Sequence, residues 1–313
     1  MKLLAVNFHY FREETYASGI YPVSKASLIR QIDALAKEYQ FVSQSDILRL
    51  MQQDKPDDKS YCVITIDDGL KEQMDAYCLL KQHGVPSILY VPSYPIQAQR
   101  VLDVHKLHYV RTQMKDADLY ELLDTHFQLS THAFDDAALA NQYRYDEPLS
   151  RKVKYFLNFV LTDEQKKQAI DLLFDALVRD EAAFARNLYM SEADIRYLSD
   201  ENALGSHGHR HLPLATLTAQ EAQVDILTSL QYFEQLCGKP VPSFSYPYGG
   251  KDAVNEQLPN LFQSSSVQFA FTMWRGINVQ EIKQQPYLLR RIDTNDAPGG
   301  KNNSTEFSLH THA

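Results

Sequence analysis

The sequence predicts an α/β fold built on a parallel sheet or barrel. Apolar runs rich in β-branched residues stand at residues 3–11, 61–67 and 86–93, as expected of buried parallel strands. Between them lie segments with the spacing of amphipathic helices, and strands alternating with helices are typical of βαβ units. The chain has 313 residues, 44% of them hydrophobic, and is long enough to bury a large core.

Helix start and stop signals place the elements around these strands. The apolar positions of residues 24–38 recur on one helical face, and Ser24 before them is a candidate N-cap. Further helices are expected at residues 43–53 and 71–84. The pattern resumes late in the chain, with helices at 191–202 and 218–238 and strand-like pieces at 241–250, 267–276 and 287–296.

The middle of the chain has a different pattern. Residues 96–187 show helical periodicity without a clear strand, which predicts a helical insertion. We therefore expect residues 1–95 and 188–300 to form the barrel and residues 301–313 to be a tail. Because loops at strand ends build functional sites, we also expect the insertion to pack over the barrel mouth and narrow the pocket.

Composition excludes several classes of protein. The formal charge of −9 and the lack of a basic stretch argue against a general nucleic-acid binder. Cys62, Cys78 and Cys237 are scattered and odd in number, so they predict buried thiols rather than a disulfide framework. No apolar stretch reaches the ~20 residues that a membrane span needs. The apolar stretch near the start is too short for a signal peptide, so a cytoplasmic location is the default expectation.

Two adjacent carboxylates end the strand at residues 61–67. Asp67 and Asp68 repel one another beside a core, so a positive charge is expected to compensate them. Farther along the chain, "GSHGHRH" places His207 and His211 four residues apart, with His209 between them. Neutral imidazole is the commonest protein ligand of divalent transition metals. A solvated turn and a histidine-rich loop without function are the simpler interpretations of each motif taken alone.

Together the two motifs predict a catalytic metal site. His207, His211 and one carboxylate would hold a divalent cation, and the second carboxylate would accept a proton from a metal-activated water. Three protein ligands with an open position are typical of a catalytic centre rather than a structural one.

Three motifs carry a family resemblance. "VITIDDGL", "LGSHGHRHLPLATLT" and "FSYPYGG" resemble, in order, the first three motifs of the NodB-type polysaccharide deacetylases, also called carbohydrate esterase family 4. The resemblance covers roughly residues 1–95 and 188–295, and it implies a distorted (β/α) barrel with its site at the C-terminal strand ends.

The resemblance also implies roles for individual residues. Asp67 would be the catalytic base, and the backbone N–H of Tyr248 would help to bind the oxyanion. The opening "VNFHYFR" resembles the start of many members and puts His9 near the site. Asp68, His207 and His211 would hold a divalent metal ion, for which we expect zinc, with other transition metals as alternatives.

The sequence departs from the family pattern in three places. Phe244 or Ser245 stands where the third motif usually has an arginine, so Arg290 or Arg291 is expected to replace it as the partner of Asp67. The ligands Asp68 and His207 are 207 − 68 = 139 residues apart, which reflects the insertion.

The third departure is the absence of a clear Leu-x-His motif, whose histidine would be the general acid. The candidates for this role are His9, favoured here, the insertion histidines His105 and His108, and His310 in the tail, with water or an inactive site as alternatives. His105 is also a candidate for substrate binding. Trp274, the only tryptophan, would either stack on a sugar ring or pack in the core.

The predicted function is a metal-dependent hydrolase that removes an N- or O-linked acetyl group from a sugar or glycan precursor. The partner is then an acetylated sugar, soluble or lipid-linked. Three alternatives stay open: a formamide or cyclic-amide hydrolase on the same barrel, a non-haem Fe(II) enzyme with a two-histidine, one-carboxylate triad, and an inactive glycan-binding barrel. A base beside the ligands favours hydrolysis, because an oxygenase needs none.

Overall fold

A computed structural model describes residues 1–16, 20–53, 57–137, 139, 147–279 and 281–302. The chain divides into two compact units. Unit 1 comprises Met1–Glu13, Pro22–Arg100 and Ala185–Ala313, and unit 2 comprises Glu14–Tyr21 and Val101–Phe184.

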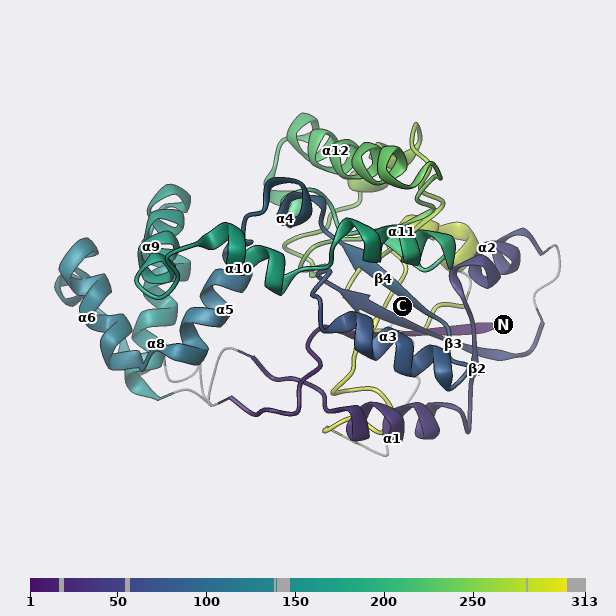
Figure 1. Cartoon of the computed structure of the whole chain (residues 1–313), viewed down its shortest axis with the longest axis horizontal. Coiled ribbons are helices and arrows are strands. Elements are labelled where there is room, and N and C mark those ends of the chain that lie inside the picture. The colour runs from purple at the N-terminus through teal and green to yellow at the C-terminus, as the bar shows by residue number, and fades with distance from the viewer. Residues whose placement is uncertain (17–19, 54–56, 138, 140–146, 280, 303–313) are drawn as a thin grey trace. The chain divides into compact units, whose positions relative to one another are not determined.

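Unit 1 is built on a parallel sheet of eight strands in the order β7-β6-β5-β4-β3-β1-β8, with β2 also paired to β3. Strands β2, β3 and β4 are labelled in Figure 1. Every strand pair is parallel, so the carboxyl ends of the strands lie at one edge. This is the predicted α/β fold, a distorted half-barrel. The strands are β1 (Lys2–Phe8), β2 (Gln40–Phe41), β3 (Ser60–Asp67), β4 (Ser87–Val91), β5 (Leu204–Ser206), β6 (Ser243–Ser245), β7 (Phe269–Phe271) and β8 (Ile292–Asp293).

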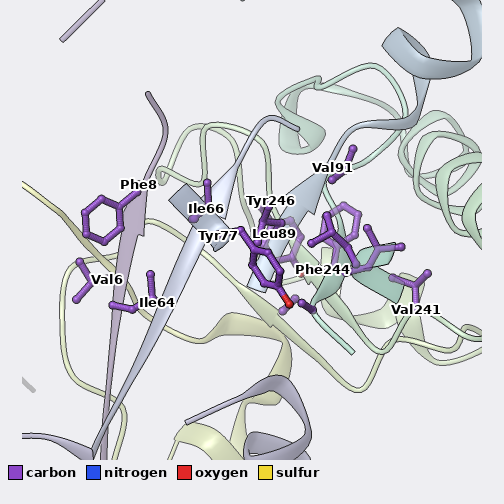
Figure 2. Packing of buried hydrophobic residues seen from close by; sticks show 14 of the residues in the cluster. Val6, Phe8, Ile64, Ile66, Tyr77, Leu89, Val91, Val241, Phe244 and Tyr246 are labelled. Atoms are coloured by element: carbon purple, nitrogen blue, oxygen red, sulfur yellow. The ribbon is translucent and has the colours of Figure 1, made fainter. Parts of the chain in front are cut away.

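The core explains why these segments are strands. β1 and β3 pair in a register that sets Val6 beside Ile64 and Phe8 beside Ile66, and all four side chains are buried (Figure 2). Strands covered on both faces bury consecutive residues, which is why "YCVITID" reads as a continuous apolar run. The same core cluster extends across the sheet to Phe244 in β6.

Polar side chains cap the N-termini of two long helices of unit 1, one of them at the predicted Ser24. Ser24 accepts a hydrogen bond from the Ser27 N–H, and Thr218 forms a full capping box with Glu221. The helices are α1 (Lys25–Leu35), α2 (Gln44–Gln52), α3 (Gln73–Gln82), α4 (Ser93–Ala98), α11 (Glu192–Asp200), α12 (Ala219–Cys237) and α13 (Glu281–Gln284), and α10 (Glu181–Leu188) crosses the unit boundary.

The described residues of unit 2 contain helices and no strand. Lys106 is buried in it and pairs with Asp171 at 2.6 Å and Glu181 at 3.1 Å. The prediction that this region covers the barrel mouth stays a prediction. Its helices are α5 (Asp103–Gln113), α6 (Asp116–Phe127), α8 (Pro148–Tyr155), continued by one π-helical turn at Phe156–Val160, and α9 (Asp163–Asp175). Among the described residues of the whole chain, no helix has the length and apolar character of a membrane span.

Two details of the sequence prediction are wrong. Of the three cysteines expected to be buried, Cys62 is buried, Cys237 is half-buried and Cys78 is exposed. Position 78 lies outside the buried stripe of α3, which runs through Gln73, Ala76, Tyr77 and Leu80. The last strand-like piece, 287–296, is mostly not strand: only Ile292–Asp293 pairs with β1, since residues 286–288 form a 3-10 turn.

Candidate active site and metal centre

The three predicted metal ligands converge at the carboxyl edge of the sheet. Asp68 follows the last residue of β3, and His207 follows the last residue of β5. The Oδ1 atom of Asp68 lies 3.2 Å from Nε2 of His211 and 3.5 Å from Nε2 of His207. All three side chains are buried, and their ligand atoms lie within 4.8 Å of one another.

A hydrogen bond fixes which nitrogen of His207 faces this cluster. Its Nδ1 lies 2.7 Å from the backbone oxygen of Ser245. A carbonyl can only accept, so Nδ1 carries the proton, and Nε2 is the nitrogen that can offer a lone pair to a metal ion in the cluster. This tautomer is the one that a metal ligand requires.

The ligand set fits a divalent transition metal. Two imidazole nitrogens and one carboxylate oxygen are ligands that zinc accepts, and three of them leave a position open. The site also attracts positive charge: burial opposes protonation of His207, but Asp67 and Asp68 outweigh it and raise the pKa of this histidine. A bound cation would compensate the negative charge of the same two carboxylates.

Two of the ligands are held in a left-handed backbone conformation. Asp68 has φ of 93° and His211 has φ of 57°, values that side-chain-bearing residues seldom adopt. The Asp68 N–H donates to the backbone oxygen of Tyr90 at 3.0 Å, which anchors the strained residue to β4. Strain of this kind clusters at functional sites, where the surrounding structure sustains it.

Asp67 lies beside the ligands, with Oδ2 3.9 Å from Nε2 of His207, but its hydrogen bonds come from other groups. Arg291 grips it with two bonds, Nη1 to Oδ1 at 2.9 Å and Nη2 to Oδ2 at 2.8 Å. Asn7 and the hydroxyl of Ser245 each donate to Oδ2 at 3.1 Å. Burial opposes ionisation of this carboxyl, but Arg291 first, then His207 and His9, hold its pKa below the ordinary value. Asp67 is therefore a carboxylate at neutral pH.

The structure decides between the two candidate arginines. Arg291 is fully buried and faces Asp67, whereas Arg290 lies 3.7 Å from Glu281 with 40% of its side chain exposed. Adjacent residues of extended chain point to opposite faces, so only one of them reaches the site. Arg291 is therefore the arginine that pairs with Asp67.

The other predicted site residues lie at different distances from this centre. His9 follows β1 at the same sheet edge, and its backbone oxygen accepts from Gln73 Nε2 at 2.7 Å. The ring of Tyr248 packs edge-on against His211 with centroids 4.9 Å apart, and 53% of the residue is exposed. His209 turns away from the ligands, with Nδ1 2.8 Å from the Ser93 hydroxyl.

The remaining candidates are not part of the ligand cluster. Trp274 packs against the core cluster, and its backbone oxygen accepts from the Arg291 N–H at 3.1 Å. Stacking of Trp274 on a sugar stays a prediction. His105 is buried in α5 of unit 2, 3% exposed, and its role in substrate binding also stays a prediction. His310 lies outside the described residues.

Sequence reasoning missed two residues that hold Asp67 in place. Asn7 donates to Asp67 and also accepts from Arg291 Nη1 at 2.9 Å. Gln73 on α3 donates to the backbone oxygens of both Asp67 and His9. The signal for Asn7 was available, because it is the one polar residue within the apolar strand Lys2–Phe8 after its first position. No comparable signal marks Gln73.

Comparison with known proteins agrees with this geometry. A family model described as polysaccharide deacetylase matches residues 185–268, which contain His207, His211 and Tyr248. No curated protein matches the chain. The matched residues include the second and third sequence motifs, whereas the first motif, with Asp67 and Asp68, lies outside them.

Several solved structures share the fold. A deacetylase of Streptococcus pyogenes, PplD, solved in complex with acetate, is 11% identical, with a TM-score of 0.59 over 94% of this chain and 92% of that one. IcaB from Ammonifex degensii is 12% identical, with a TM-score of 0.54 over 93% of this chain and 91% of that one. A de-N-acetylase of Aggregatibacter actinomycetemcomitans is 14% identical, with a TM-score of 0.54 over 93% and 94% of the two chains. At such identities the likeness establishes the fold alone.

Proposed function

We propose that the chain is a metal-dependent hydrolase, because residues 185–268 match the polysaccharide deacetylase family model and unit 1 has a deacetylase-like fold. Its proposed substrate is a sugar or glycan precursor with an N- or O-linked acetyl group. The observation that carries the proposal is the buried Asp68–His207–His211 cluster with an ionised carboxylate, Asp67, directly beside it. We propose zinc as the metal, on the chemistry of the ligand set.

The chain's own groups have distinct parts in this reaction. When bound, the metal supplies a Lewis acid and lowers the pKa of a water molecule at its open position. Asp67 accepts a proton from the attacking water, and Arg291 keeps Asp67 ionised and aimed. The Tyr248 backbone N–H donates to the developing oxyanion. His9 gives a proton to the departing nitrogen or oxygen.

Metal removal and acetate release test the proposal. We expect the purified protein to release acetate from acetylated amino sugars or acetyl esters of sugars, and to lose this activity on treatment with a chelator. Stoichiometric zinc should restore it, because Asp68, His207 and His211 alone do not activate water. Acetate is measured enzymatically with and without dioxygen.

Other products of the same assay identify the alternative reactions. Formate in place of acetate would indicate a formamide hydrolase, and a requirement for dioxygen would indicate an oxygenase. A protein that binds the glycans but turns none over would show that the barrel is inactive.

The acid role of His9 has its own prediction. His9→Ala should slow hydrolysis of an amide substrate by about 10²–10⁴-fold, because an amine leaves only after it gains a proton. An ester with a good leaving group should lose much less. The substitution is well suited to the test, since Gln73 holds His9 through its backbone oxygen, which alanine keeps. The comparison is made on the two substrates at equal metal content.

His83 provides a matched control for this variant. It is an exposed histidine at the C-terminal end of α3, so His83→Ala should leave both rates unchanged. Equal losses on amide and ester in His9→Ala would assign His9 to binding or structure, and an unchanged amide rate would eliminate it as the acid.

A further inference from the structure

A buried carboxylate outside the catalytic centre holds the loop between the two histidine ligands. Asp225 lies on α12, is only 5% exposed, and was not singled out from the sequence. Its Oδ1 accepts from the His209 N–H at 2.8 Å, and its Oδ2 accepts from the Arg210 N–H at 3.0 Å. These two residues separate His207 from His211 in the chain.

We propose that Asp225 is a positioning residue that sets metal affinity by fixing the backbone of residues 208–211. The inference rests on the proposed metal site and assigns no catalytic step to Asp225. A carboxylate can hold two successive N–H groups at once because both of its oxygens accept. We call this pair of hydrogen bonds the Asp225 clamp. Each donor is a backbone N–H group, so the clamp fixes the backbone of the loop rather than one side chain.

The loop is shaped to receive this carboxylate. Gly208 has φ of 73°, and a Cβ atom on it would lie 2.7 Å from Asp225 Oδ1. Glycine therefore both permits the left-handed turn and leaves the space that the carboxylate occupies. Any side chain at position 208 would push Asp225 away from the N–H groups that it binds.

The opposite side of the loop is fixed by a second element. The Ser93 and Tyr94 N–H groups of α4 donate to the backbone oxygens of Gly208 and His209 at 3.1 Å and 3.0 Å. Two backbone oxygens of the loop are thus bound from α4 and two of its N–H groups from α12. With His207 anchored at the end of β5, the clamp determines where the chain delivers His211.

Asp225→Asn tests the inference with a nearly isosteric change. The amide has one oxygen and one NH₂ group, and the NH₂ group cannot accept, so one of the two N–H bonds is lost. We expect zinc to bind the variant about 10–100-fold more weakly, the range seen when residues that orient metal ligands are replaced. The measurement is a competitive zinc titration of the metal-free protein, well below its melting temperature. It is repeated with Co²⁺, whose absorption spectrum reports ligand geometry and should change.

Asp200→Asn is the matched control. Asp200 is exposed at the end of α11 and pairs with Lys239 on the surface, so its replacement should leave zinc affinity and the Co²⁺ spectrum as in the parent protein. If Asp225→Asn lowers the melting temperature but binds zinc with parental affinity and an unchanged Co²⁺ spectrum, Asp225 only supports the fold and the inference is overturned.

Gly208→Ala keeps the inference testable if Asp225→Asn does not fold. The added methyl group should displace the Asp225 carboxylate and weaken zinc binding in the same way. In the double variant Gly208→Ala, Asp225→Asn, the loss should be smaller than the product of the two single losses, because both changes break one clamp. Independent, multiplying losses would contradict it. A parent protein that binds no zinc would instead overturn the proposed function together with the inference, so the two failures are distinguishable.

Discussion

Asp67→Asn is expected to lower turnover by about 10²–10⁴-fold while the protein keeps its metal. The asparagine cannot accept the proton of the attacking water, but it removes none of the three groups that converge on the metal position. Asn7 and Ser245 donate to Oδ2 of Asp67 and can donate equally to an amide oxygen, which helps the side chain to stay in place. Activity and metal content are measured on the same preparation.

The neighbouring acid supplies the matched comparison. Asp68→Asn should lose both turnover and metal, because Asp68 is the only carboxylate within the ligand cluster found among the described residues. We thus expect the two variants to show different roles for the adjacent acids, with Asp67 as the base and Asp68 as a metal ligand. Substantial activity in Asp67→Asn would refute the assignment of the base, and loss of metal from that variant would show that Asp67 also serves as a ligand.

Arg291→Met is expected to destabilise the protein by about 3–5 kcal/mol, the usual cost of removing one partner from a buried ion pair. Arg291 is fully buried and makes bidentate contact with Asp67, which is itself 2% exposed. Methionine fills similar volume but leaves the Asp67 carboxylate without its countercharge. The free energy of unfolding is measured by denaturant titration of the metal-free proteins.

Arg290 is a control adjacent in the chain. Its side chain is 40% exposed and lies 3.7 Å from Glu281, so Arg290→Met should change stability by less than about 1 kcal/mol. Arg291→Lys adds a second comparison, because it keeps the charge and loses the planar fork that grips both carboxylate oxygens. Similar losses in Arg290→Met and Arg291→Met would mean that the Arg291–Asp67 pair contributes nothing particular to the fold.

Much of the fold was predictable because its signals are local. β3 is a mainly apolar run that ends at the carboxylate Asp67. The seven residues of β1 include only one buried polar side chain, that of Asn7. Ser24 and Thr218 cap helices through bonds to residues three positions away. The spacing of His207 and His211 is equally local, so the metal ligands on one loop could be proposed without a structure.

The sequence by itself determined the parallel α/β fold, the helical character of the middle region and the residue types of the candidate metal site, since each shows in short local motifs or periodic patterns. Only the tertiary structure decided which arginine meets Asp67, because Arg291 lies 224 residues away from it. The same holds for Asn7, 60 residues before Asp67. It also holds for Asp225 on α12, which binds the histidine loop at His209, 16 positions earlier in the chain. These contacts form because the sheet brings the ends of distant strands and helices together. No local sequence pattern indicates which ends will meet.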